Sequence, residues 1–420
     1  MDNVFDFRNR LINEYSSFSR SFSKVSAQDI LSKVEQEYDR GRYWPEPLIQ
    51  INPNYKRQST VQQLAHEGML HASCSHIFQT GKTEGKAADL HLYVHQLQAL
   101  AKAQKQQSYV VTTGTGSGKS LAFFVPIIDR ILKAKQADPQ KRTRAIVIYP
   151  MNALANSQLE ELDKFLHGYP DDQKPFTVAR YTGQESDADR KQIADNPPDI
   201  LLTNFMMLEL ILTRFEDVDR RVVEHCQGLE FLVLDELHTY RGRQGADVAL
   251  LVRRLRERLQ ASQLVCIGTS ATMSSTGTQA DRNQTVANVA SLLFGAQITE
   301  HDVIGETLER VTNPAKDIEA VKSLLKPALL KESYHWPDFA AFSDDPLAVW
   351  VELSLGIELP LDEPPRRARP VTLGDAAKRL ADDAQCTVED AHAGLQRFLV
   401  AAHDVKTPQG RAPFAFKLHQ

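Results

Sequence analysis

Short apolar runs separated by amphipathic stretches dominate the middle of the chain. Six runs rich in β-branched and other apolar residues recur there: 109–112, 144–149, 176–181, 199–203, 231–235 and 264–268. Continuous apolar runs of this length are typical of strands buried on both faces. Their alternation with helical stretches predicts an α/β fold with a doubly wound, mostly parallel sheet. Polar residues that follow these strands should gather at the carboxyl edge of the sheet.

The first part of the chain, up to about residue 88, shows a helical pattern instead. Apolar side chains recur every three or four residues, on one face of a helix: Phe7, Leu11, Tyr15, Phe18, Phe22 and Val25. Such a face either packs against its own domain or forms a surface for a partner.

Beyond about residue 296 the alternation of strands and helices fades. Two helical stretches follow, near 373–382 and 388–403, with Thr387 as a suitable N-cap for the second. These helices either pack together or form a helix-turn-helix that reads DNA. The pattern therefore predicts a helical N-terminal accessory segment (1–88), an α/β domain (89–296) and a mainly helical accessory region with a linker (297–420).

Composition narrows the class of protein. The 420 residues are 42% hydrophobic and 25% charged, as in a folded globular protein. The formal net charge of −5 provides no protein-wide positive field, so any nucleic-acid site must be local. The four cysteines form no C-x-x-C pair, which excludes an obvious disulfide framework or zinc ribbon. Without a signal-like N-terminus or a long apolar run, we expect a cytoplasmic protein and no membrane contact.

A glycine-rich motif stands directly after the first predicted strand. It has the shape of a P-loop with threonine in the place of the first glycine: Thr113, Gly114, Thr115, Gly116, Ser117, Gly118, Lys119 and Ser120. The glycines would let the backbone wrap around phosphate at the start of the next helix. Lys119 would reach the β- and γ-phosphates, and the Ser120 hydroxyl would ligate Mg²⁺. The alternative, a glycine-rich surface turn, fits the flanking strand and helix less well.

Two adjacent carboxylates end the fifth predicted strand, in the sequence Leu234 to His238 (LDELH). Packing alone explains them poorly, because uncompensated buried charge is unfavourable. A metal nucleotide explains them better: Asp235 would hold Mg²⁺ through water, and Glu236 would orient and deprotonate the attacking water. His238 either is a structural histidine or links this site to the rest of the domain.

A third polar element ends the sixth predicted strand. Its two hydroxyls flank a small residue: Ser270, Ala271 and Thr272. Such hydroxyls can bridge between the hydrolytic carboxylates and a moving neighbour. We therefore interpret them as coupling residues.

Together these residues resemble the first RecA-like motor domain of superfamily 2 helicases of the DEAD/DEAH type. TGSGKS is similar to motif I, DELH to motif II and SAT to motif III. Upstream, Gln96 resembles the Q motif, whose amide reads the adenine edge of ATP. The resemblance implies an ATP-dependent helicase with ATP and Mg²⁺ as cofactors.

The same resemblance implies a nucleic-acid contact along the sheet edge. Motifs Ia and Ib and the glycine motif between them grip the backbone of a strand in this superfamily, and their positions here are Pro150, Asn152, Gly183, Thr203 and Asn204. Amides and hydroxyls at this edge would reconcile an acidic chain with a nucleic-acid partner, with DNA favoured over RNA.

Three sequence segments are similar to those of the MrfA-like branch of bacterial repair helicases and of related helicases of phage defence: YPMNALAN, LLTN and DELHTYRGRQGADVALLVRRLRERL. Resemblance to that branch implies a DNA-stimulated ATPase that translocates 3′ to 5′ along a strand. The resemblance covers about residues 88–310.

A Q-x-x-G-R-x-x-R-like motif, which supplies arginine fingers from a second motor domain, does not occur before Gln420. We therefore expect an N-terminal part of a larger helicase, nearly inactive by itself without the second RecA-like domain. Two alternatives remain: an ATP-sensing scaffold of a defence complex whose helical N-terminal segment docks a partner protein, and a translocase that moves along duplex DNA without unwinding it.

Overall fold

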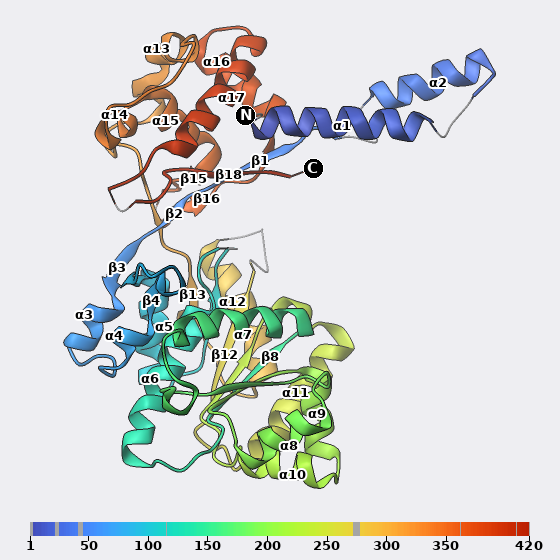
Figure 1. Ribbon diagram of the computed structural model, residues 1–420. Coiled ribbons are helices and arrows are strands. Elements are labelled where there is room, and N and C mark those ends of the chain that lie inside the picture. Colours follow the sequence, from blue (N-terminus) through green and yellow to red (C-terminus); the bar gives the residue numbers. More distant parts are fainter. Residues whose placement is uncertain are drawn as a thin grey trace. The chain divides into compact units, whose positions relative to one another are not determined.

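The chain folds into two compact units. The structure, a computed structural model, describes residues 3–21, 25–40, 45–114, 116–271, 278–361, 363–408 and 410–419. Unit 1 combines residues 1–54 with 308–420, and unit 2 comprises residues 55–307 (Figure 1). This division differs from the expected boundaries at 88 and 296.

A parallel sheet of seven strands forms the centre of unit 2. Its order is β13 (Val303–Gly305), β7 (Tyr109–Thr112), β12 (Val265–Ser270), β11 (Phe231–Leu234), β8 (Ala145–Tyr149), β10 (Ile200–Asn204) and β9 (Val178–Tyr181). Every neighbouring pair in this sheet is parallel. The six predicted strands and the doubly wound class are confirmed, while the edge strand β13 was not predicted.

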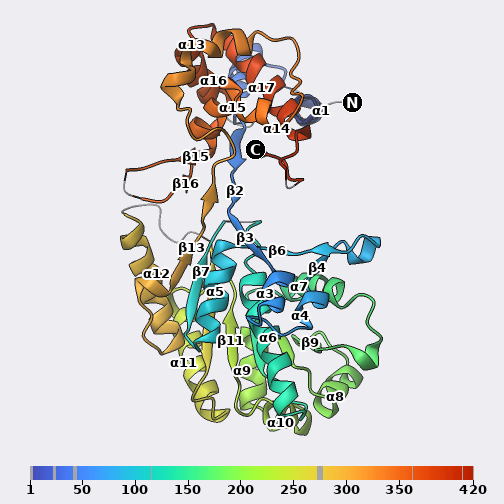
Figure 2. The same ribbon diagram turned by 90° about the vertical axis from the view of Figure 1, so that its left-hand side faces the viewer.

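Helices cover both faces of this sheet. One face carries α5 (Val94–Gln104), α6 (Leu121–Ala137) and α7 (Asn152–Leu166). The other carries α8 (Asp187–Asp195), α9 (Phe205–Thr213), α10 (Asp217–Glu224), α11 (Gly242–Arg258) and α12 (Gln279–Phe294). Figure 2 shows α5 and α6 on one side of the strands and α11 and α12 on the other. Alternate strand residues serve opposite cores: Val147 packs with the first group and Ile146 with the second.

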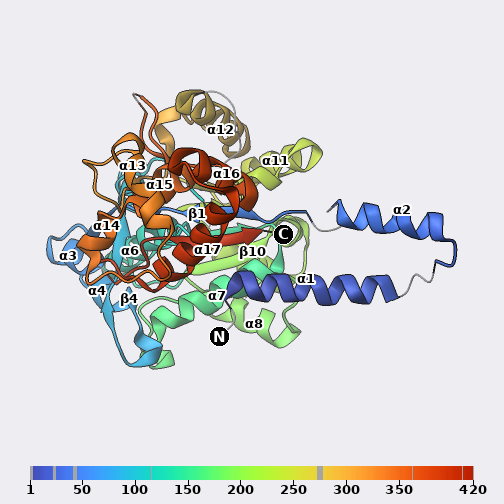
Figure 3. The ribbon, with the colours of Figure 1, turned by 90° about the horizontal axis from the view of Figure 1, so that it is seen from above.

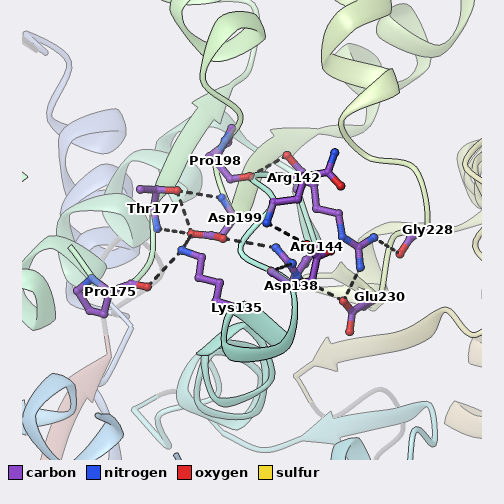
Figure 4. A network of polar contacts seen from close by, with 12 residues as sticks. Lys135, Asp138, Arg142, Arg144, Pro175, Thr177, Pro198, Asp199, Gly228 and Glu230 are labelled. Atoms are coloured by element: carbon purple, nitrogen blue, oxygen red, sulfur yellow. Dashed lines mark hydrogen bonds and ion pairs between the residues drawn. The ribbon is translucent and has the colours of Figure 1, made fainter. Parts of the chain in front are cut away.

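At the amino edge of the sheet, a network of charged side chains connects the starts of neighbouring strands (Figure 4). Arg144 is 1% exposed, and its guanidinium lies 3.9 Å from Asp199 and 3.6 Å from Glu230. Asp199 also pairs with Lys135 at 2.6 Å and accepts hydrogen bonds from the backbone and hydroxyl of Thr177. This network ties the starts of β8, β9, β10 and β11 together on the side away from the predicted site.

Residues 55–93 pack onto unit 2 rather than forming part of a separate N-terminal segment. They begin within β2 (Asn54–Tyr55) and contain β3 (Arg57–Thr60), α3 (Val61–His66), α4 (Cys74–Ile77), β4 (Gln79–Thr80), β5 (Ala88–Asp89) and β6 (His91–Tyr93). Strand β3 pairs with β6 in an antiparallel ribbon, and Val61, Leu64 and Ile77 enter the same core as α6. The burial of these apolar side chains explains why the expected boundary at 88 does not separate two units.

Unit 1 is mainly helical, with a small antiparallel sheet. Its elements are α13 (Ile318–Leu329), α14 (Phe339–Ser343), α15 (Pro346–Val351), α16 (Leu373–Ala384) and α17 (Val388–Asp404), and its sheet has the order β17 (Val371–Thr372), β1 (Leu48–Asn52), β18 (Ala415–His419). A short hairpin pairs β15 (Ile357–Glu358) with β16 (Arg366–Arg367), and β14 (Leu308–Glu309) pairs with β2. The pairing of β1 with β18 brings both ends of the sequence into one unit, and Trp350 and Phe398 are buried in its core.

The two predicted C-terminal helices are confirmed as α16 and α17, which pack against each other. Thr387 caps α17, because its side chain accepts a hydrogen bond from the backbone N–H of Asp390. Their buried faces belong to the core of unit 1. The two helices therefore pack together, which was one of the two predicted arrangements. A DNA-reading role stays a prediction.

The N-terminal helical pattern is confirmed as α1 (Val4–Ser21), followed by α2 (Gln28–Asp39). Both helices project from the remainder of unit 1 (Figure 3). The side chains of the predicted apolar face are largely exposed: Phe7, Leu11, Tyr15 and Phe18 are 52–59% exposed. Phe5 instead anchors α1, stacking on Phe416 at 5.9 Å. Phe22 lies outside the described residues, and Val25 lies beyond the end of α1.

Among the described residues, every helix is either too short or too polar to span a lipid bilayer.

Candidate active site

The predicted P-loop connects β7 to α6 at the carboxyl edge of the sheet. Gly116 and Gly118 have φ angles of 80° and 67°, a left-handed conformation that favours glycine. No described residue accepts a hydrogen bond from five backbone N–H groups here: Gly116, Ser117, Gly118, Lys119 and Ser120. Consecutive amides before a helix are suited to bind an anion, because the helix dipole adds to their positive charge. Thr115 lies outside the described residues.

Side chains from α5 hold the back of this loop. His95, which is fully buried, places Nε2 at 2.9 Å from the carbonyl oxygen of Ser117. The amide of Gln96 donates to the carbonyl oxygen of Gly118 at 2.9 Å and accepts from the backbone N–H of Tyr93 at 2.8 Å. A Cβ atom at Gly118 would lie 2.6 Å from that amide, so the contact requires glycine. Gln96 thus contacts the loop itself, and its reading of adenine stays a prediction.

Inside the loop, the hydroxyls of Thr113 and Ser117 are 2.6 Å apart and buried. The N–H group of Gly114 donates to the carboxylate of Glu306 at 3.1 Å. Glu306 follows β13 and was not predicted from the sequence; because it is 192 residues from Gly114, no local pattern could have indicated it.

The two carboxylates of the DELH sequence face this loop from the end of β11. Lys119 Nζ lies 3.3 Å from Glu236 Oε1, which confirms that the loop and the DELH residues meet. Glu236 has a φ of 53°, which is unfavourable for a side chain of this kind and concentrates backbone strain at the site. Burial raises the pKa of Asp235, against the opposing effect of a hydrogen bond from Thr269. Its ionised form therefore needs a cation nearby.

Thr269 connects the two carboxylate residues from the neighbouring strand β12. Its hydroxyl donates to Asp235 and accepts a hydrogen bond from the backbone N–H of Glu236 at 3.1 Å. Thr269 is fully buried. The sequence indicated the hydroxyl-rich end of this strand, yet it pointed to the residues that follow Thr269.

Of the predicted coupling residues, Ser270 ends β12 and Ala271 follows it directly. His238 Nδ1 is 3.2 Å from Glu236 Oε2 and 3.4 Å from the hydroxyl of Ser270. The Ser270 hydroxyl donates to the carbonyl oxygen of Ala271 at 2.8 Å. His238 thus bridges the DELH carboxylate and the end of β12, while Thr272 lies outside the described residues.

Residues predicted to contact nucleic acid come together where β8, β9 and β10 end. Asn204 donates to the side chain of Asn152 at 2.7 Å and to the carbonyl oxygen of Thr182 at 3.0 Å, which joins the three loops. Pro150, just before Asn152, is half-buried, and Gly183 is exposed with a φ of 88°.

Thr203 is placed differently from its neighbours at this edge. Its side chain is fully buried, and its hydroxyl donates to the carbonyl oxygen of Tyr181 at 2.6 Å. The Thr203 hydroxyl therefore stabilises the sheet edge and does not face solvent.

Comparisons with known proteins place this geometry in context. The family model for the DEAD/DEAH box helicase matches residues 93–280. An uncharacterized ATP-dependent helicase of Bacillus subtilis, YprA, is 35% identical over 185 residues, which cover 44% of this chain and 23% of that protein. The Lhr helicase/uracil glycosylase of Escherichia coli is 32% identical over 204 residues, covering 44% of this chain and 13% of that protein. The chain thus spans less than a quarter of each of these two relatives.

Among solved structures, the DUF1998 helicase MrfA bound to DNA is 23% identical, with a TM-score of 0.47, and covers 70% of this chain and 37% of that one.

Proposed function

Because residues 93–280 match the family model of the DEAD/DEAH box helicase, we propose that unit 2 binds ATP with Mg²⁺ and couples its hydrolysis to movement along nucleic acid. One observation carries the nucleotide assignment. Five consecutive backbone N–H groups, from Gly116 to Ser120, have no acceptor among the described residues, and the Lys119 side chain among them pairs with the carboxylate of Glu236. A surface turn has no reason to combine these features.

The residues present fit a magnesium nucleotide. Mg²⁺ usually takes one or two protein oxygens and completes its shell with water and phosphate. The Ser120 hydroxyl would supply a direct oxygen, and Asp235 would hold the ion through water. When bound, the ion neutralises phosphate charge during transfer. Lys119 binds the terminal phosphates, and Glu236 orients the attacking water and accepts its proton.

Binding of the nucleotide is tested by titrating the chain with a fluorescent ATP analogue. The Lys119→Ala variant should lose binding, because the cation that holds the terminal phosphates is gone. Lys105→Ala, which removes the same charge from the exposed end of α5, is the matched control and should bind like the wild type. Unchanged affinity in Lys119→Ala would remove the P-loop assignment.

We propose that the polymer along which unit 2 moves is nucleic acid, with DNA favoured over RNA. The loops at Asn152, Thr182 and Asn204 support this proposal, since hydrogen bonds between them hold three polar loops together at one edge of the sheet. Fluorescence anisotropy with single-stranded DNA, single-stranded RNA and duplex DNA of one sequence tests it. Asn204→Ala should weaken binding, whereas Asn288→Ala on the exposed side of α12 should not. Equal binding by both variants would contradict the proposed interface.

Turnover requires a second RecA-like domain in this proposal. Loss of an arginine finger typically lowers the rate by ~10³ to 10⁵, so residues 1–420 alone should bind ATP yet hydrolyse it slowly. Brisk DNA-stimulated hydrolysis by this chain would contradict the requirement. Strand-displacement and translocation assays on the longest natural form would separate an unwinding helicase from a duplex translocase, in phage defence or repair.

A second candidate function is an ATP-sensing scaffold that docks a partner protein through α1. The exposed row formed by Phe7, Leu11, Tyr15 and Phe18 favours it. The carboxylate of Glu236 beside Lys119 favours hydrolysis, because a pure switch needs no group to activate water. Steady-state ATPase measurements with and without DNA distinguish the two.

A further inference from the structure

Glu306 ties the P-loop to the segment by which the chain leaves unit 2. Its carboxylate accepts the hydrogen bond of the Gly114 N–H at 3.1 Å. It lies directly after β13, which pairs with the P-loop strand β7 through Gly305 and Thr112. Two residues later the chain passes from unit 2 to unit 1.

The two crossings between the units are hydrogen-bonded to each other where they meet unit 2. The backbone N–H of Lys56 donates to the carbonyl oxygen of Thr307 at 2.9 Å. The N–H of Val94, at the start of α5, donates to the carbonyl oxygen of Lys56 at 3.1 Å. The first turn of α5 also holds the back of the P-loop, as described above. One crossing is therefore connected to the P-loop through the first turn of α5, and the other through Glu306.

Charge makes the Glu306 contact sensitive to what the P-loop holds. A carboxylate and a polyphosphate are both anions, and the site already contains Asp235 and Glu236 with Lys119 as the cation between them. A bound polyphosphate adds negative charge on the same loop whose first N–H group the Glu306 carboxylate holds. Like charges repel more strongly inside a partly buried site than they do in bulk water.

We propose that Glu306 is a positioning residue that detects polyphosphate in the P-loop and passes this signal to the two chain crossings. The proposal rests on the nucleotide site described under the proposed function. Without nucleotide, the carboxylate holds the Gly114 N–H group. With nucleotide, repulsion weakens this bond and loosens the segment after β13, so the hydrogen bond between Lys56 and Thr307 opens more often.

Hydrogen exchange measured by mass spectrometry tests this sequence of events. The wild-type chain is compared with and without a magnesium-bound, non-hydrolysable ATP analogue. The analogue should protect peptides that cover 113–120 and should increase exchange at the Lys56 amide by about threefold or more. Glu306→Gln keeps an oxygen for Gly114 but removes the charge, so protection of 113–120 should remain while the response at Lys56 disappears.

Glu300→Gln is the matched control. It removes the same charge from the turn just before β13, where Glu300 pairs only with the exposed His301 at 3.8 Å among described residues. This variant should respond like the wild type. Glu306→Ala is the second variant, and it should also lose the response at Lys56, whatever its effect on folding stability.

The affinity for nucleotide distinguishes this proposal from a merely structural role of Glu306, because the two predict different changes. Removing the charge should tighten binding of the triphosphate analogue by about three- to tenfold in Glu306→Gln, and binding of the diphosphate by less. A purely structural role predicts unchanged affinity for Glu306→Gln and weaker binding for Glu306→Ala. That result would overturn the proposal.

The failure of each idea is recognisable. If nucleotide does not protect 113–120 in the wild type, the proposed nucleotide site itself is wrong. If 113–120 is protected but exchange at Lys56 stays unchanged, or if Glu306→Gln keeps the wild-type response, only the role of Glu306 is overturned.

Discussion

Lys119 Nζ lies 3.3 Å from Glu236 Oε1, so the P-loop cation is already paired with the DELH carboxylate. The lysine side chain is 15% exposed and the glutamate 26%, which makes this a partly buried pair. A triphosphate has to take Lys119 from this partner. The carboxylate that we propose for hydrolysis would therefore compete with nucleotide for the lysine.

Substitution Glu236→Gln should consequently separate binding from chemistry. Without the competing charge, the affinity for an ATP analogue should rise by about threefold, whereas single-turnover hydrolysis should fall by ~10² or more because the general base is lost. Nucleotide titration and a chase of radiolabelled ATP with enzyme in excess measure the two quantities. Weaker binding, as expected for Lys119→Ala, would show that Glu236 supports the loop instead of competing for its cation.

The raised pKa of Asp235 predicts a pH dependence of stability. Burial raises the pKa of this carboxyl in the folded chain, so folding favours its protonated form. The resulting stabilisation is present below the ordinary aspartate range and is lost as pH rises through the folded-state pKa. At neutral pH the ionised group therefore destabilises the nucleotide-free chain.

Asp235→Asn should accordingly raise the melting temperature of the nucleotide-free chain at pH 7 by about 2–4 °C, and the gain should shrink toward pH 4. Thermal denaturation across this range measures it, with the exposed Asp247→Asn as a control. A lower melting temperature in Asp235→Asn would mean that its ionised form is stabilised by groups other than a bound cation.

Local patterns were sufficient to predict the central strands and the position of the glycine-rich loop after the first of them. Strands such as 145–149 are buried on both faces and so form continuous apolar runs. Strand β13 has three residues at the edge of the sheet, too few to give a pattern. The division of the chain depends on pairing between β1 and β18, for example Leu48 with His419, and no local sequence pattern reports a pairing so distant.

The same distinction applies to the site. Lys119, Asp235 and Glu236 were predicted because each stands in a contiguous motif after a strand. Thr269 and Glu306 act through contacts made only in the folded chain. For α1, the helical spacing predicted an apolar face correctly, but such spacing does not indicate what the face contacts.

The Thr269 bridge predicts a stability effect at the site. Thr269→Val keeps the shape but removes the donor to Asp235 and the acceptor for the Glu236 N–H, so both partly buried groups lose this hydrogen-bond partner. The free energy of unfolding should fall by about 1–3 kcal/mol. Thr269→Ser keeps the hydroxyl and should lose less, which urea denaturation can resolve. Equal losses would assign the effect to the methyl group rather than to the hydrogen bonds.

The charged network at the opposite edge of the sheet should matter for stability and not for nucleotide binding. Arg144→Met removes a buried guanidinium between Asp199 and Glu230, and the free energy of unfolding should fall by about 2–4 kcal/mol because those carboxylates lose a neighbouring cation. Arg130 also pairs with Glu230, at 2.6 Å, but its side chain is 49% exposed. Arg130→Met should therefore change stability by only about 0–1 kcal/mol.

Urea denaturation of the two arginine variants, followed by nucleotide titration of each, measures both effects. The nucleotide affinity of the folded Arg144→Met chain should match the wild type, since its contacts lie at the starts of the strands while the P-loop follows the end of β7. If the fully folded Arg144→Met variant binds nucleotide more weakly than the wild type, the starts of the strands influence the position of the P-loop. An equal loss of stability in both variants would instead show that solvent screens Arg144 as it does Arg130, despite the difference in their exposure.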